Sequence, residues 1–266
     1  MDHRSTRPRF LIVKTGQAVP EARGLDGNDG DFEDWFMAGL GRGRFDYATV
    51  RVDRDEPLPD PETPEPAADE SDGGSREPLA GVLVTGSPAM VSHREPWSER
   101  TAEWLAAAFR AGLPMLGVCY GHQLLAHALG GTVGPNPNGR RMGRFETRVL
   151  DANDPLLGRY APSQAFHVSH VESVLEPPAG AQVIGTAVHD PYHALRFGDR
   201  AWGVQFHPEF GRSVMRAYIQ ARAAPLAAEG QDPAALVRGV VDDTVGPGLL
   251  AGFGALVAGA RPAAAA

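Results

Sequence analysis

The stretch that decides the fold is PMLGVCYGHQ at residues 114–123. Residues 114–118 form a short apolar run that is typical of a buried strand, and a helical pattern over residues 120–129 begins directly after the cysteine. A strand, a sharp turn and a helix in this order form a nucleophile elbow, here with cysteine in place of serine. Gly117 and Gly121 leave room for the strand and the helix to approach each other closely.

The chemistry of this turn centres on Cys119, the only cysteine of the chain. A side chain at the start of a helix lies at the positive end of the peptide dipole, which favours the thiolate over the thiol. The same turn aims the N–H of Tyr120 outward, where it can meet an oxyanion. The stretch therefore predicts a thiol nucleophile.

Short apolar runs alternate with helical patterns on the N-terminal side of this stretch. The expected strands lie at residues 10–14, 49–52, 81–85 and 114–118, and the expected helices at 31–40, from an N-cap at Ser98 to Gly112, and at 120–129. Strands separated by helices of this length imply parallel pairing with right-handed crossovers. The pattern predicts an α/β fold, a three-layer sandwich with a central, mostly parallel, flavodoxin-like sheet.

After Gly131 the sequence pattern is typical of successive β-strands, which predicts an antiparallel β addition to this fold. The expected strands lie at residues 145–150, 165–170, 182–188, 194–197 and 201–206, followed by a helix at 212–223. We expect one domain over residues 1–225 and a C-terminal helical extension over residues 226–266, in which the apolar residues from Leu249 to Val257 share one helical face.

The acidic charge of the chain is concentrated in one segment. Residues 55–77 carry nine acids against one base, Arg76, so this segment has a charge of −8, which equals the formal net charge of the whole chain. It also carries five of the chain's prolines and almost no bulky apolar residue, and it is expected to be a flexible surface insertion that acts as a spacer.

Composition excludes several classes of partner. The charged start MDHRSTRPRF predicts neither a secretory signal nor an anchor, and the apolar stretch at residues 247–260 is too short and too rich in glycine to span a membrane. With a single cysteine, no internal disulfide can form, which suits a reducing compartment. We therefore expect a cytoplasmic protein without a membrane partner. No basic stripe is present, so no nucleic-acid partner is expected.

A second motif, GVQFHPE at residues 203–209, closes the last expected strand. Residues i and i+2 of an extended segment point to the same side, so His207 and Glu209 face together, while Pro208 keeps His207 away from helical angles. A carboxylate beside an imidazole fixes its tautomer and stabilises its charged form, as a catalytic triad requires.

Together the two motifs resemble those of the class I glutamine amidotransferases, Gly-x-Cys-x-Gly-x-Gln and a distant His-Pro-Glu. The likeness extends from about Phe10 to Ala223. It implies that Cys119 is the nucleophile, that His207 is the general base and then the acid, and that Glu209 orients His207.

The resemblance also implies residues that bind the substrate. Gln123 would hold the glutamyl group, and residues 167–170 are similar to the segment of guanylate-synthetase glutaminase domains that binds the α-carboxylate and α-amine, which implicates Ser169 and His170. The N–H of Gly86 or Ser87 would complete the oxyanion hole with that of Tyr120.

Two departures leave the substrate open. Ser87 replaces a glycine of the family's usual Gly-Gly-Pro loop, in a form similar to the γ-glutamyl peptidases, and Arg141 lies where related domains often carry an acid.

No cofactor is expected. Neither the pair His167 and His170 nor the pair His122 and His127 has a spacing that forms a chelating face, so no metal site is predicted, and no phosphate-binding loop indicates ATP chemistry.

Three functions remain open at this point. The first is a glutaminase that acts alone or with a synthetase partner subunit, and the second is a peptidase for a γ-glutamyl peptide or amine. The third is a binding or regulatory module without turnover. The intact set of cysteine, histidine and glutamate disfavours the third.

Overall fold

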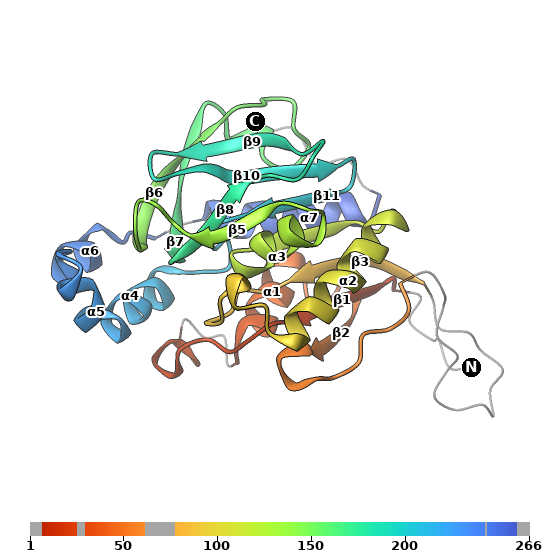
Figure 1. Ribbon diagram of the computed structural model, residues 1–266, viewed down its shortest axis with the longest axis horizontal. Helices are drawn as coiled ribbons and strands as arrows, with labels where there is room; N and C mark the ends of the chain where they lie inside the picture. Colours follow the sequence, from red (N-terminus) through yellow and green to blue (C-terminus); the bar gives the residue numbers. More distant parts are fainter. Residues whose placement is uncertain (1–6, 26–29, 62–77, 243, 260–266) are drawn as a thin grey trace.

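The computed structural model in Figure 1 describes residues 7–25, 30–61, 78–242 and 244–259. The strands, in chain order, are β1 (Arg9–Lys14), β2 (Asp46–Arg51), β3 (Leu79–Val84), β4 (Met115–Val118), β5 (Thr132–Pro135), β6 (Arg141–Val149), β7 (Ser163–His170), β8 (Glu172–Glu176), β9 (Gln182–Ala187), β10 (Asp190–Gly198) and β11 (Ala201–Val204). The α-helices are α1 (Phe32–Leu40), α2 (Pro96–Arg110), α3 (Tyr120–Ala128), α4 (Arg212–Ala221), α5 (Ala223–Ala228), α6 (Pro233–Gly239) and α7 (Val245–Val257). Most of the predicted acidic insertion lies outside the described residues.

The described strands form a nine-stranded sheet in the order β2-β1-β3-β4-β11-β10-β9-β6-β7. Neighbours from β2 to β11 are parallel, and this part has the strand order of flavodoxin-like folds. The ladders from β11 onward are antiparallel and continue the same sheet, whereas β5 and β8 pair separately. This topology confirms the predicted α/β fold with an antiparallel addition.

Helices cover both faces of the parallel strands, which gives three layers (Figure 1). Successive residues of a strand point to opposite faces. Accordingly Val13 of β1 belongs to a buried cluster with Leu105 of α2. Its neighbour Ile12 belongs to another cluster with Phe36 of α1 and Phe253 of α7.

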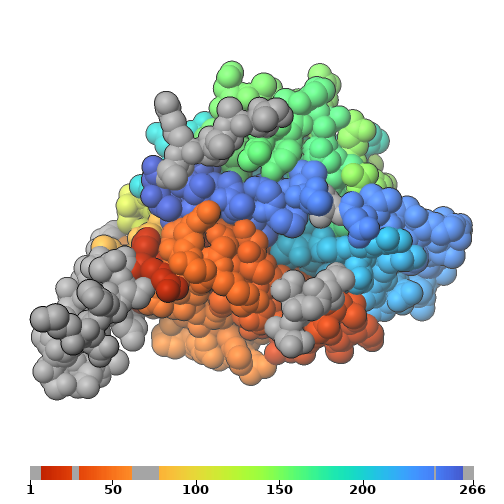
Figure 2. All heavy atoms as spheres, turned by 180° about the vertical axis from the view of Figure 1, so that it is seen from behind, coloured from red at the N-terminus to blue at the C-terminus, as the bar shows by residue number. Residues whose placement is uncertain are grey.

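The helix α7 packs on the main core rather than projecting from it. Phe253 meets Phe10 of β1 edge-on, with ring centroids 6.3 Å apart, and Leu250 packs so tightly on α1 that a Cβ on Gly39 would lie 2.3 Å from its Cδ1. Figure 2 shows α7 as a blue band alongside the orange surface of the N-terminal part. Of the described helices, none is long and apolar enough to span a membrane.

The helix α2 begins earlier than the sequence indicates. Pro96 is its first residue, a position at which proline is favoured because no acceptor is needed for its missing N–H. Ser98 therefore lies inside the helix, and the expected N-cap at this residue is wrong. Instead, the buried Ser98 hydroxyl shares a hydrogen bond of 2.7 Å with the hydroxyl of Tyr120 and ties α2 to α3.

Candidate active site

Cys119 lies at the bend between β4 and α3, at the carboxyl edge of the parallel strands. Its backbone has φ 52° and ψ −104°, a conformation that residues other than glycine rarely adopt. The bend is held on both sides, because Cys119 N–H donates to Val204 O at 2.8 Å and Gly121 N–H donates to Thr85 O at 3.1 Å. Such strained backbone gathers at functional sites.

Gly117 and Gly121 lie where the strand and the helix nearly touch. A Cβ on Gly117 would lie 2.4 Å from Gly121 O, and a Cβ on Gly121 would lie 2.3 Å from Val84 O. Both contacts are with backbone atoms, which cannot give way as a flexible side chain can. Glycine is therefore required at both positions for the sharp bend that carries the thiol.

His207 and Glu209 lie together just after β11, at the same edge of the sheet. His207 Nδ1 hydrogen-bonds to Glu209 Oε1 at 2.6 Å, and the two side chains are 4% and 0% exposed. The Phe210 ring stacks on the imidazole with centroids 4.0 Å apart. With Nδ1 engaged by the carboxylate and the ring held by Phe210, the imidazole has one fixed orientation.

The charge on His207 is set by its two neighbours. Burial disfavours the charged imidazole, but the Glu209 carboxylate and a hydrogen bond with Cys119 favour it more strongly, so the pKa of His207 is raised to about 10. The structure thus brings Cys119, His207 and Glu209 together, although 88 positions separate the first two in the sequence.

The loop after β3 passes beside both groups. A Cβ on Gly86 would lie 3.0 Å from His207 Cε1 and 3.8 Å from Cys119 Cβ, so a larger residue would press on the imidazole. Ser87 Oγ donates to Thr15 O at 2.7 Å. Tyr120 is the first residue of α3, so its N–H has no acceptor within the helix and is available to a ligand.

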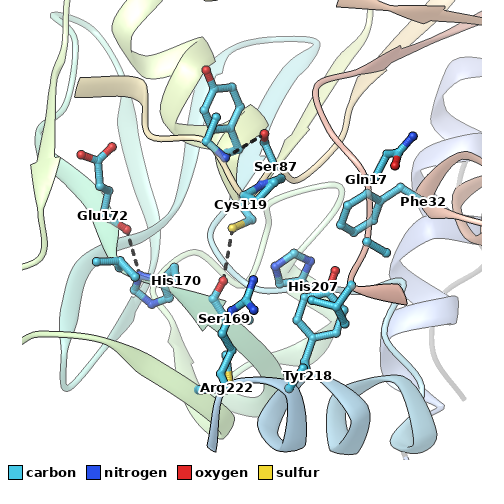
Figure 3. Close-up of a pocket in the computed structure, with 18 of the residues that line it drawn as sticks. Gln17, Phe32, Ser87, Cys119, Ser169, His170, Glu172, His207, Tyr218 and Arg222 are labelled. Atoms are coloured by element: carbon cyan, nitrogen blue, oxygen red, sulfur yellow. Dashed lines mark hydrogen bonds between the residues drawn. The ribbon is translucent and has the colours of Figure 1, made fainter. Parts of the chain in front are cut away.

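A cavity of about 400 Å³ opens over the thiol, and Cys119, which is 6% exposed, lies in its wall (Figure 3). Cys119 Sγ lies 3.6 Å from Ser169 O. Ser169 and His170 line the cavity from β7, next to the thiol.

Gln123 lines the cavity from α3 and is held rigidly. Its Nε2 donates to Glu172 O at 2.7 Å and to Gln205 Oε1 at 2.9 Å. Both N–H bonds of the amide are thereby used, so only the amide oxygen is left to accept a hydrogen bond from a bound molecule. Most of the site residues that the sequence predicts line this cavity, namely Ser87, Cys119, Tyr120, Gln123, Ser169, His170 and His207. Glu209 and Gly86 are not in the cavity wall, but both lie against His207.

Comparison with known proteins identifies the family. The family model named "Glutamine amidotransferase class-I" matches residues 61–223, more than half of the chain. The chain belongs to this family. Membership confirms the predicted class of enzyme, a cysteine-dependent glutamine amidotransferase.

Similar proteins include longer enzymes. The glutamine-hydrolysing GMP synthase of Aeropyrum pernix is 38% identical over 151 residues, which are 55% of this chain and 28% of that protein. The GMP synthase of Geobacillus kaustophilus is 40% identical over 136 residues, which are 50% of this chain and 25% of that protein. The chain spans about a quarter of the length of these curated relatives.

Solved structures share the fold over almost the whole chain. A glutamine amidotransferase of Thermotoga maritima has a TM-score of 0.69 at 19% identity and covers 95% of this chain and 99% of its own. A glutamine amidotransferase of Methylobacillus flagellatus has a TM-score of 0.66 at 21% identity, with 96% and 94% covered.

The motifs did not indicate several residues that line the cavity of this amidotransferase. Gln17 and Phe32 follow β1, Tyr218 lies on α4, and Arg222 directly follows α4 (Figure 3). The strand order offers a signal for the first pair, because ligands of open α/β sheets bind where neighbouring loops diverge, here after β1 and β3. No comparable signal marks Arg222, which lines the cavity from the junction of α4 and α5, far from the motifs in sequence.

Four histidines of the amidotransferase, His122, His170, His189 and His193, are buried, and His170 is also part of the cavity wall. The ring centroids of His170 and His189 are 5.5 Å apart, and those of His189 and His193 are 5.3 Å apart. Burial is the main cause that lowers the pKa of each, to about 4 for His122 and His189, to about 3 for His170, and well below the ordinary value for His193. No group of His, Cys, Asp or Glu in the described ranges could hold a metal ion.

These histidines predict loss of stability in mild acid. Above pH 6.5 they are neutral in both states, but as the pH falls below about 6.5 the unfolded chain takes up protons that folded His122, His170 and His189 refuse until about pH 3–4. His193 acts in the same direction, because burial lowers its pKa well below the ordinary value. Each such group removes about 1.4 kcal/mol of stability per pH unit in this window. Asp190 and Asp53 oppose them, because burial raises the pKa of both carboxyl groups, to about 6 for Asp190. His207, whose pKa is raised, opposes them only above pH 6.5. We expect the urea midpoint to fall steeply between pH 7 and pH 5.

Two variants test the source of this slope. His189→Gln removes one buried titrating ring and is expected to make the midpoint less sensitive to pH. His93→Gln, at an exposed histidine, is expected to leave the sensitivity unchanged. Equal slopes for the two variants and the wild type would show that the buried rings are not responsible.

Proposed function

We propose that the protein hydrolyses the γ-amide of glutamine, or of a γ-glutamyl compound, through a thioester on Cys119. One observation carries this proposal. An imidazole held at 2.6 Å by a buried carboxylate contacts a lone thiol at a strained strand-to-helix bend, in the wall of a cavity. This arrangement supplies a nucleophile, a proton carrier and its orienting group.

The first half of the reaction forms the thioester. Cys119 Sγ adds to the carbonyl carbon of the amide, and the oxyanion accepts hydrogen bonds from Tyr120 N–H and from the loop at Gly86 and Ser87. His207 then donates its proton to the departing nitrogen. The C–N bond breaks, and ammonia or an amine leaves a γ-glutamyl thioester on the enzyme.

The second half releases glutamate. Water gives a proton to the now neutral His207 and adds to the thioester carbon at the same oxyanion site. The C–S bond then breaks, which returns the Cys119 thiolate beside the imidazolium. Glu209 keeps its charge throughout and stabilises the imidazolium in each half.

Three residues of the cavity are proposed to hold the glutamyl group. The Gln123 amide oxygen accepts a hydrogen bond from the α-ammonium group, because its N–H donors are already used. Backbone groups at Ser169 and His170, next to the thiol, bind the α-amino acid end. His170 is buried and neutral, so it contributes shape rather than charge.

A synthetase subunit is the proposed partner when glutamine is the substrate. The relatives named above are GMP synthases, and the present chain matches only about a quarter of each. Ammonia released at Cys119 would pass to a second protein that consumes it. We expect glutamate release to rise when such a partner is added.

A γ-glutamyl peptide is the second candidate substrate, and the cavity supports it. A volume of about 400 Å³ lies in the range for molecules larger than glutamine. Arg140 and Arg222 both line this cavity. Arg140 is paired with Glu229 at 3.1 Å, whereas Arg222 forms no ion pair with a carboxylate of the described residues. A free guanidinium in a cavity suits a substrate carboxylate.

A panel of substrates tests both candidates. Purified protein is incubated with glutamine, γ-glutamyl-alanine and γ-glutamyl-alaninamide, and both glutamate and ammonia are measured. Glutamate from none of them would refute the proposed hydrolysis. Glutamate from glutamine alone would leave the first candidate, and faster release from the dipeptide would favour the second.

Arg222→Ala is expected to lower kcat/KM for γ-glutamyl-alanine by about tenfold while sparing γ-glutamyl-alaninamide, because only the former carries the second carboxylate. Arg216→Ala, on the neighbouring helix α4 but outside the cavity, is the matched control. An equal loss for both dipeptides would show that the Arg222 guanidinium does not act on the second carboxylate.

A further inference from the structure

Two buried threonines lie directly behind the loop that borders the thiol. Thr15 follows β1 and is 1% exposed, and Thr85 follows β3 and is 0% exposed. Thr15 N–H donates to Thr85 Oγ1 at 3.1 Å. Thr15 Oγ1 lies 3.0 Å from Thr85 O and 3.0 Å from Gly86 O. Thr85 Oγ1 lies 3.0 Å from Gly86 O. The mechanism above uses neither hydroxyl.

Each hydroxyl has a single proton to donate. Thr85 Oγ1 accepts from Thr15 N–H, and its own proton has two acceptors in reach, Gly86 O at 3.0 Å and Thr15 Oγ1 at 3.2 Å. Thr15 Oγ1 donates to Thr85 O or to Gly86 O, which lie at equal distance. The Gly86 carbonyl is thus faced by two hydroxyl groups, on the side of the loop where Thr15 and Thr85 lie.

The direction of this carbonyl fixes the direction of the next N–H. A trans peptide is planar, with its C=O and N–H on opposite sides. Since Gly86 C=O points toward the two threonines, Ser87 N–H points away from them. Ser87 lines the cavity, and its N–H has no acceptor among the described residues. Its Oγ donates to Thr15 O at 2.7 Å, which is a second link between Thr15 and the residues of this peptide.

We propose that Thr15 and Thr85 are positioning residues that hold the peptide between Gly86 and Ser87 in one orientation, so that Ser87 N–H, rather than Gly86 N–H, is the loop's oxyanion donor. This inference rests on the proposed function. The donor is in place before substrate binds, and Ser87 in place of glycine adds a side-chain tether that glycine could not make.

Without the hydroxyl groups of Thr15 and Thr85, the peptide between Gly86 and Ser87 can flip. Gly86 has no side chain to oppose rotation, so its carbonyl can swing toward the thiol once its two donors are lost. A carbonyl oxygen at that place would repel the oxyanion. We call the two hydroxyl groups of Thr15 and Thr85 that face Gly86 O the clamp. The clamp should therefore act on the transition state and leave substrate binding almost unchanged.

The test replaces Thr15 in the full chain, once wild-type release of glutamate has been established. Thr15→Val keeps the shape and removes the hydroxyl. We expect kcat to fall between about tenfold and about a hundredfold with KM within about twofold, because one preorganised oxyanion donor is weakened. Thr15→Ser restores the hydroxyl and should restore most of kcat.

Thr147→Val is the matched control. Thr147 is fully buried on β6, and its hydroxyl has no hydrogen-bond partner in the described structure, so the same chemical change there removes no bond. If Thr15→Val does not fold, Thr85→Val removes the other hydroxyl that faces Gly86 O and gives a second reading of the same clamp.

Alkylation of Cys119 by iodoacetamide separates the clamp from a displaced thiol, because alkylation builds no oxyanion. An unchanged alkylation rate with a reduced kcat supports the clamp. Equal losses in kcat and in the alkylation rate would overturn it. A wild-type kcat in both Thr15→Val and Thr85→Val would also overturn it. A wild-type protein that alkylates normally but hydrolyses no substrate would instead refute the proposed function.

Discussion

Cys119→Ala is expected to lower glutamate release by about 10⁴-fold or more, which is the scale of loss when a covalent nucleophile is removed. The alanine keeps the Cβ and so keeps the unusual backbone at φ 52°. The thermal midpoint should stay within a few degrees of the wild type, since a nearly buried sulfur is lost without any change in the bend. Release of glutamate is measured with the best substrate of the panel.

The single cysteine makes this test unusually clean. Because the sequence contains one cysteine, any thiol adduct on the intact protein reports on Cys119 alone. A glutamine-directed electrophile such as diazo-oxo-norleucine should add one mass increment to the wild type and none to Cys119→Ala. Substantial turnover by the alanine variant would require another nucleophile and would end the thioester mechanism.

The bend and its partners could be predicted because local sequence dictates their geometry. Gly117 and Gly121 allow the strand and the helix to cross closely. The two-residue spacing of His207 and Glu209 keeps their side chains within hydrogen-bonding reach, although residues 207–210 form a turn, in which Phe210 N–H donates to His207 O at 3.3 Å, rather than the expected extended segment. The apolar strands between helices also carried enough information for the fold. In each case a short-range constraint acts within a few residues.

The features that the sequence did not indicate depend on contacts between distant segments. Arg222 reaches the cavity only because α4 packs where it does, and no short-range pattern marks it. His189 packs on Phe145 and His193 packs on Phe206, both distant in sequence, so the burial of these histidines is not evident from spacing. The start of α2 was missed because the preference of proline for the first helical position outweighed the capping tendency of Ser98.

The second large effect is expected from Glu209→Gln, which keeps the size of a fully enclosed side chain and removes its charge. The carboxylate and the thiolate together raise the pKa of His207 to about 10 against the effect of burial. Without Glu209, burial is opposed by Cys119 alone, so that pKa should fall. We expect kcat to decrease by about 10³-fold, because the imidazolium is less stable and the ring is less well oriented.

The pH profile gives this prediction its direction. Activity needs the charged His207, so the alkaline limb of kcat/KM should move to lower pH in Glu209→Gln. The stability of the folded state depends on the same pKa. The raised pKa of His207 stabilises the native state fully below pH 6.5, and this stabilisation is lost as the pH rises through about 10, so the variant should lose more stability at pH 6 than in alkaline solution.

A second carboxylate and histidine pair provides the control. Glu99 Oε1 lies 3.1 Å from His127 Nε2, and the pair is remote from the thiol on α2 and α3. Glu99→Gln removes the same charge from the same kind of partner and should leave kcat and its alkaline limb unchanged. If Glu209→Gln behaved like Glu99→Gln, His207 would not depend on its carboxylate, and the orienting role of Glu209 would have to be abandoned.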